Sequence, residues 1–146
     1  MASIDPYLHF EKDCEKAFNF YKSVFGGEFT SFNRFSEMPP HPEYKVPEAE
    51  KERVMHVTLP IGKGSFLRGS DTSSAFTPNM TPPANNFSVS VNVDSQAEAD
   101  RIFQGLSDGG QVTMPIGKTF WNSYFGACND QFGVQWMVSF DLGQQS

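Results

Sequence analysis

The sequence predicts an α+β fold made of two βαβββ modules that form a shared, cupped mixed sheet. The first observation is that the order strand, helix, Gly-Gly, three strands is read twice along the 146 residues. The second is that the two Gly-Gly pairs, at 26–27 and 109–110, end two amphipathic segments 83 positions apart (109 − 26). Because each half is too small to bury a sufficient core, we expect one domain over 1–146, with modules at about 5–72 and 86–141 and a linker at 73–85.

The first module opens with the alternating stretch PYLHF, which predicts a strand. Leu8 and Phe10 share one face of it, and Tyr7 and His9 share the other. The next segment predicts a helix with Asp13 as its N-cap and a stripe of apolar residues at helical spacing: Ala17, Phe18, Tyr21, Val24 and Phe25.

Three more strands are predicted in this module. EFTSFNRF is followed by a long loop rich in proline and charge, and then by RVMHVTLPIG. In this strand Met55, Val57 and Leu59 alternate with Val54, His56 and Thr58. GSFLRGSD completes a hairpin with it through residues 62–64.

The second module repeats the pattern with different residues. FSVSVNV predicts a strand, and the helix that follows starts at a capping box formed by Ser95 and Glu98. The buried stripe of this helix is expected at Ala99, Ile102, Phe103 and Leu106. QVTMPIGK, SYFGACN and GVQWMVSF predict the last strands.

Each helix is expected to cover the more apolar face of its sheet, which leaves the opposite faces to line a concave surface. Those faces combine small hydroxyls, amides, imidazoles and apolar groups, a mixture suited to a small organic ligand. The residues collected in this way are Tyr7, His9, Val54, His56, Thr58, Ser88, Ser90, Asn92, Gln135 and Met137.

Composition excludes several classes of partner. The formal net charge is −6 and no basic block is present, so we expect neither a nucleic-acid partner nor binding to an anionic membrane. No apolar run approaches the roughly 18 residues of a spanning helix. The N-terminal residues lack the pattern of a signal peptide, which favours a cytoplasmic location. The two cysteines, Cys14 and Cys128, are expected to be reduced structural thiols.

Several words in the chain resemble one known family. They are PYLHF, EKAFNFYKSVFGGE, MHVTLPIGKGSFLRGSD, VDSQAEADRIFQGLSDGG and TFWNSYFGACNDQFGVQWMV. Together they resemble the PhnB-like branch of the vicinal oxygen chelate superfamily, which includes glyoxalase I, bleomycin-resistance proteins and extradiol dioxygenases. The branch is often labelled as a 3-demethylubiquinone-9 3-methyltransferase domain. Homodimers are common in the superfamily, so the resemblance implies a homodimer here.

The resemblance also implies where a divalent metal would be held. The first-strand ligand position falls at Pro6 or Tyr7, its counterpart falls near Ser88, and the glutamate of the last strand falls on Met137. These residues do not supply the oxygen or imidazole ligands of such sites, so we predict no cofactor and no metal of the usual kind. No glycine-rich strand-to-helix turn suited to a nucleotide-like methyl donor is present.

His56 is the candidate catalytic residue, as an acid or base on the predicted ligand face; the alternative is a structural, hydrogen-bonded histidine. Arg68 could bind an anion through two donors, but the face on which it lies is ambiguous and a surface role is favoured. Asp71 is expected to cap the following loop, and Asp130 to form the Asx-type turn before the last strand. Trp136 is expected in the core. The residues Trp121, Tyr124 and Phe125 are expected to line either the cavity or a dimer seam.

Three functions stay open at this point. The first is a metal-free binder of a small organic molecule through Tyr7, His9, His56, Thr58, Ser88, Ser90, Trp121, Tyr124 and Met137. The second is an enzyme of the lyase, isomerase or dioxygenase type that holds a divalent metal with unusual ligands. The third is a structural dimer with a vestigial site. The first and third are favoured by the missing metal ligands.

Overall fold

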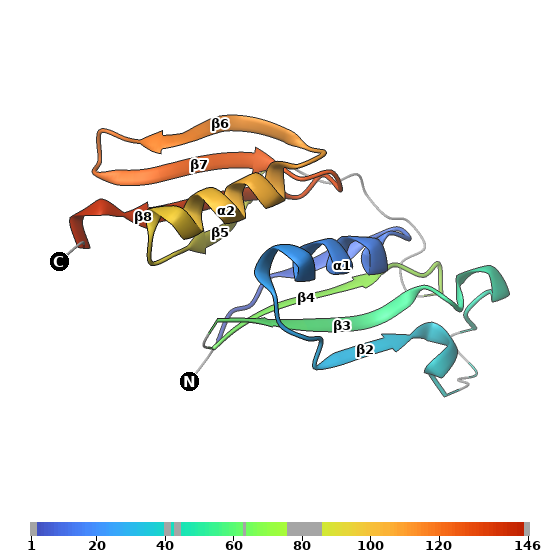
Figure 1. The fold of residues 1–146 in the computed structure, drawn as a ribbon. Helices are drawn as coiled ribbons and strands as arrows, with labels where there is room; N and C mark the ends of the chain where they lie inside the picture. Colours follow the sequence, from blue (N-terminus) through green and yellow to red (C-terminus); the bar gives the residue numbers. More distant parts are fainter. Residues whose placement is uncertain (1–2, 40–41, 43–44, 63, 76–85, 145–146) are drawn as a thin grey trace. The chain divides into compact units, whose positions relative to one another are not determined.

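The structure is a computed structural model that describes residues 3–39, 42, 45–62, 64–75 and 86–144. Its contacts divide the chain into two compact units, Met1–Pro82 and Pro83–Ser146, and each unit is described here by itself (Figure 1). Most of the predicted linker 73–85 lies outside the described residues.

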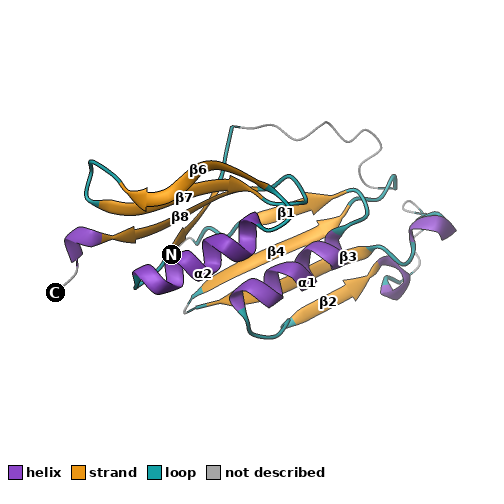
Figure 2. Cartoon of the chain, turned by 45° about the horizontal axis from the view of Figure 1, so that its top comes forward, coloured by secondary structure: helices purple, strands orange, loops and turns teal. Residues whose placement is uncertain are grey.

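The first unit is a four-stranded mixed sheet with one helix packed on it (Figure 2). The strand order is β1-β4-β3-β2, in which β1 runs parallel to β4 and the other neighbours are antiparallel. Two short 3-10 turns, Phe35–Glu37 and Glu48–Glu50, lie between β2 and β3. The elements are β1 (Tyr7–Phe10), α1 (Cys14–Phe25), β2 (Ser31–Arg34), β3 (Val54–Ile61) and β4 (Ser65–Asp71).

The second unit has the same topology. Its strand order is β5-β8-β7-β6, with β5 parallel to β8. The α+β class and the repeated βαβββ module are therefore confirmed, whereas the cupped surface common to both modules and the single domain stay predictions. The elements are β5 (Val89–Asn92), α2 (Gln96–Ser107), β6 (Gln111–Lys118), β7 (Ser123–Asn129) and β8 (Gln135–Asp141).

Helix α1 begins where predicted but is capped by a different residue. Asp13 occupies the N-cap position without a side-chain hydrogen bond to the helix. Instead, the buried carboxylate of Asp71 accepts the Cys14 N–H at 2.8 Å and the Val54 N–H at 2.9 Å. The prediction that Asp71 caps the loop after β4 is therefore wrong, because its two oxygens join the start of α1 to the start of β3.

Helix α2 is built as its sequence predicts. Ser95 Oγ accepts the Glu98 N–H at 3.1 Å, which satisfies one of the free donors at the helix N-terminus. All four residues of the predicted apolar stripe are buried. Gly109 follows the helix with a φ of 77°, a left-handed conformation that glycine adopts without steric cost.

Each helix covers one face of its own sheet. A Cβ on Gly69 of β4 would lie 2.5 Å from the Phe18 ring of α1, and one on Gly126 of β7 would lie 2.8 Å from the Phe103 ring of α2. The absence of a side chain at these two positions lets the helix pack close to the strands. The predicted alternation of buried and open residues is confirmed for β1, where Leu8 and Phe10 are buried.

One strand face differs from the prediction. The pairing of β2 with β3 shifts register, so that Asn33 lies opposite His56 but Arg34 lies opposite Val54. Met55 is the extra residue of this bulge, which interrupts the alternation of the strand. Val54 is fully buried, and its N–H bonds to the Asp71 carboxylate. Val54 therefore does not belong with His56 and Thr58 on the open face.

The turn before β8 is organised by a single buried carboxylate, as predicted. Asp130 Oδ1 accepts the N–H groups of Phe132 and Val134 at 2.8 and 3.1 Å. Its Oδ2 accepts the indole N–H of Trp136 at 2.8 Å. Trp136 is 1% exposed, which confirms its predicted place in the core.

Both cysteines are free and buried, and we expect them to be unreactive in the native protein. Burial raises the pKa of the Cys14 thiol and raises the pKa of Cys128 from 9.0 to about 11. At about pH 8, the native Cys128 thiolate fraction is therefore about 100-fold lower than in an unfolded chain. Reaction with Ellman's reagent should be at least about 100-fold slower in buffer than in urea. One rapidly reacting thiol per native chain would contradict this expectation.

Candidate functional site

The face of the first sheet opposite α1, here called the helix-free face, carries a connected group of polar side chains. Tyr7 Oη lies 3.4 Å from His56 Nδ1, and His56 Nε2 lies 2.9 Å from Thr58 Oγ1. The imidazole is therefore held through both of its nitrogens. Which nitrogen donates and which accepts depends on the tautomer of the ring.

Arg68 of β4 extends this group. Its Nη1 donates a hydrogen bond to Thr58 Oγ1 at 3.2 Å, and its guanidinium lies over the Phe66 ring at 5.0 Å. Its Nε lies 3.7 Å from a carboxylate oxygen of Asp5. The ambiguity over the face of Arg68 is resolved, because Leu67 on the helix side places its neighbour on the other side.

Arg68 was not among the predicted binding residues, because the sequence left the face of its strand ambiguous and favoured a surface position. Asp71 at its end suggests a solvent-facing position, whereas Leu67, on the same face of the strand, suggests the core. The buried Asp71 resolves this conflict, since it bonds to backbone groups on the helix side. If the strand alternation is counted from Leu67 as a core residue, Arg68 falls on the opposite, helix-free face.

His9 completes the aromatic part of the helix-free face. Its ring centroid lies 5.0 Å from that of Tyr7, and the Tyr7 and His56 rings are 5.9 Å apart. Thr58 is buried, whereas Tyr7 is 40% exposed, so the group runs from a covered hydroxyl to an accessible ring. The structure thus brings together Tyr7, His9, His56 and Thr58, four of the nine predicted binding residues.

Two predicted residues of the second unit are neighbours on its sheet. Ser90 of β5 pairs with Met137 of β8, which lies between the buried Trp136 and Val138, so both are on the face away from α2. Ser88 is exposed and precedes β5. The expectation that residues of both modules enclose one cavity stays a prediction.

The aromatic residues before and within β7 separate into two environments. Trp121 is 50% exposed and contacts the rings of Phe120 and Phe125, with centroids 4.9 and 5.8 Å apart. Tyr124 instead donates its hydroxyl hydrogen to Asp100 of α2, which raises the Tyr124 pKa. Tyr124 therefore lies on the helix-covered side of its sheet, opposite the face that carries Ser90 and Met137. The alternation of β7 explains this placement.

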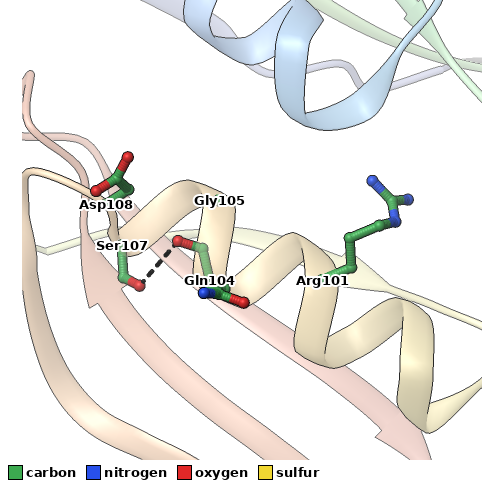
Figure 3. Close-up of a pocket in the computed structure, with 5 residues that line it drawn as sticks. All are labelled: Arg101, Gln104, Gly105, Ser107 and Asp108. Atoms are coloured by element: carbon green, nitrogen blue, oxygen red, sulfur yellow. Dashed lines mark hydrogen bonds between the residues drawn. The ribbon is translucent and has the colours of Figure 1, made fainter.

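A surface hollow of about 560 Å³ lies elsewhere, along α2 and its C-terminal end (Figure 3). None of the predicted site residues lines it. Figure 3 shows its side chains on one helical segment, with Ser107 donating to the Gln104 carbonyl at 3.4 Å. A single helix surface offers no convergent polar groups, so we place the candidate site on the helix-free face of the first sheet. The hollow is lined by Arg101, Gln104, Gly105, Ser107 and Asp108.

The donor groups do not fit a divalent metal of the kind that the resemblance implies. The positions that the resemblance implies hold a phenol, a hydroxyl and a thioether, at Tyr7, Ser88 and Met137. Asp71, at the end of β4, uses its two oxygens for backbone N–H groups. Within the described part of the chain, no three His, Cys, Asp or Glu side chains form a group that could hold a metal ion.

The paired βαβββ units define the class of protein. A glyoxylase/bleomycin resistance protein/dioxygenase domain from Frankia sp. EAN1pec shares the fold, with a TM-score of 0.66, 11% identity, and coverage of 99% of this chain and 96% of that chain. A family model described as 3-demethylubiquinone-9 3-methyltransferase matches residues 2–139. The chain belongs to this family, the PhnB-like group that its motifs resemble.

Three further proteins are more similar to this chain in sequence. The crystal structure of protein PA1353 from Pseudomonas aeruginosa is 38% identical, with a TM-score of 0.83 and coverage of 97% of this chain and 98% of that chain. PhnB protein from Bacillus cereus is 27% identical, with a TM-score of 0.73 and coverage of 95% and 99%. Protein YjdN of Escherichia coli (strain K12) is 27% identical over 137 residues, which cover 93% of each chain.

The family's description names a methyl transfer, but the two strand-to-helix turns lack the glycines of a nucleotide-binding turn. The turns from β1 to α1 and from β5 to α2, at residues 11–13 and 93–95, contain no glycine that would let a backbone approach a nucleotide-like donor.

Among the described residues, no helix is both long and apolar enough to cross a membrane.

Proposed function

We propose that this protein binds a small organic molecule on the helix-free face of the first sheet without a divalent metal. The observation that carries the proposal is the hydrogen-bonded series from Tyr7 through His56 and Thr58 to Arg68. Binding sites for small molecules combine apolar surface with a few well-placed polar groups. The Tyr7 and Phe66 rings supply the apolar surface, and the series supplies the polar groups.

The rigidity of this group supports recognition rather than a purely structural role. His56 is held at both nitrogens, and Tyr7 stays 40% exposed while contacting it. Side chains that are already ordered lose little entropy when a ligand binds, so more of the contact energy contributes to affinity. His56 therefore joins an exposed phenol to a buried hydroxyl.

The proposal is tested with a screen of small organic compounds by thermal shift. A compound present at about ten times its Kd adds about 1.4 kcal/mol, which raises the Tm of a chain of this size by about 3–6 °C. We expect His56→Ala to weaken such a compound about tenfold and Tyr7→Phe to weaken it less, because only one hydroxyl is removed. Excess EDTA should leave the shift unchanged.

Tyr124→Phe is the matched control for Tyr7→Phe. It removes the same hydroxyl, but from a side chain bonded to Asp100 of α2. We expect the thermal shift to persist in this variant. A shift that survives in both His56→Ala and Tyr7→Phe would locate binding elsewhere and overturn the proposal, and a shift abolished by EDTA would overturn its metal-free part.

A further inference from the structure

We propose that the ligand of the helix-free face carries a compact oxyanion, such as a carboxylate, and that Arg68 binds it. This inference rests on the proposed function and adds the chemical class of the ligand. It also makes Arg68 a specificity-determining residue, and Asp5 a counter-ion that the ligand replaces.

Arg68 retains most of its donor capacity. A guanidinium has five N–H donors, and within the described residues Arg68 uses one of them, toward Thr58 at 3.2 Å. Asp5 lies at 3.7 Å, which is longer than a hydrogen bond. Because planar guanidinium groups pair with oxyanions through two parallel N–H donors, Arg68 can accept such a ligand without losing its bond to Thr58.

The guanidinium is already positioned for this role. Phe66 lies beneath it at 5.0 Å and Thr58 fixes one of its nitrogens, so the side chain does not have to be ordered by the ligand. The side chain of Arg68 is 34% exposed, which leaves it accessible from the helix-free face. A buried structural arginine would instead have its donors satisfied by the protein.

The charge on this face differs from that of the whole chain. The protein has a formal net charge of −6, yet the strand residues on the helix-free face include one arginine and two histidines and no carboxylate. Asp5, which precedes β1, is the carboxylate that faces Arg68. An anionic ligand that displaces Asp5 would therefore meet Arg68 and neutral hydrogen-bond donors on this face.

The neighbouring rings indicate what the oxyanion is attached to. Tyr7 pairs directly with Arg68 between β1 and β4, and the rings of His9 and His56 flank Tyr7 at 5.0 and 5.9 Å. Flat apolar surface beside a guanidinium suits a carboxylate on a planar or aromatic body. Benzoate is therefore the probe, and benzamide is its neutral counterpart of nearly equal shape.

The test is an NMR titration of the ¹⁵N-labelled full chain with benzoate and with benzamide. We expect benzoate to bind at least about tenfold more tightly, since it forms two charge-assisted hydrogen bonds, each roughly twice as strong as a neutral one. Arg68→Gln should abolish the preference by weakening benzoate and leaving benzamide unchanged, and Arg68→Lys should retain part of it. Asp5→Asn should strengthen benzoate about threefold, because a competing charge is removed.

Arg101→Gln is the control for non-specific charge effects, because it removes an exposed arginine from α2. It should leave the benzoate affinity unchanged. Equal binding of both probes, lost in His56→Ala, would retain the site and overturn the anionic class. A preference that survives both Arg68 variants would overturn the role of Arg68. If benzoate leaves the helix-free face unperturbed while compounds from the thermal screen bind there, this inference fails alone; if neither binds there, the proposed function fails with it.

Discussion

Asp130→Ala is expected to lower the free energy of unfolding by about 3–4 kcal/mol. The substitution leaves three N–H donors without their acceptor: those of Phe132, Val134 and the Trp136 indole. Asp130 is 4% exposed and Trp136 is 1% exposed, so water replaces the lost bonds poorly. Urea unfolding followed by circular dichroism and tryptophan fluorescence measures the change.

The isosteric variant Asp130→Asn separates the lost hydrogen bonds from the lost volume. Its carbonyl oxygen can keep the two backbone bonds, but its amide group faces the Trp136 donor, so we expect a loss of about 1–2 kcal/mol. Asp141→Ala is the exposed control, because among the described residues that carboxylate accepts one hydrogen bond, from the Gly143 N–H at 2.9 Å. Equal effects of Asp130→Ala and Asp141→Ala would show that burial of the Asp130 network contributes nothing.

Gly110→Ala is expected to destabilise the chain by at least about 3 kcal/mol. A Cβ at this position would lie 2.1 Å from the carbonyl oxygen of Asn129 and 2.8 Å from the backbone carbon of Asp130. These are backbone atoms at the end of β7, which cannot rotate away as a side chain would. Gln111, the first residue of β6, pairs with Asn129 of β7. The start of β6 must therefore move away from β7.

Gly117→Ala, within β6, is the matched control for Gly110, which directly precedes that strand. A Cβ there meets no atom within 4 Å, so the variant should be neutral or slightly more stable, by up to about 1 kcal/mol, because alanine restricts the unfolded chain. The Gly110→Ala and Asp130→Ala effects should also be less than additive, since both disturb the backbone at Asp130. A Gly110→Ala protein as stable as Gly117→Ala would refute the predicted clash.

Much of the fold follows from local patterns in the sequence. The apolar stripe of α2, its Ser95 cap and the alternation of β1 were predicted correctly because each depends on residues within a few positions of one another. The turn at Asp130 was also predicted, since an Asx-type turn is a short-range structure. The repeat of these patterns was sufficient for the βαβββ topology of each unit.

The errors arise where distant segments meet. Asp71 bonds to Cys14 and Val54, which are 57 and 17 positions away, and no local pattern reveals such partners. The register shift between β2 and β3 removed Val54 from the open face, because a bulge depends on the pairing of two strands. Tyr124 bonds to Asp100, 24 positions away, from the side of the sheet that α2 covers, and the position of α2 over that face is likewise a tertiary feature.

The candidate site shows the same division. The sequence by itself determined that Tyr7, His9, His56 and Thr58 share the open faces of strands, since period-two alternation is a local property of the chain. Only the tertiary structure decided that β4 lies between β1 and β3, which brings Arg68 to Thr58 and next to Tyr7. Strand order depends on contacts between residues far apart in the chain, whose closure is favoured by burial of the whole core rather than by any short motif.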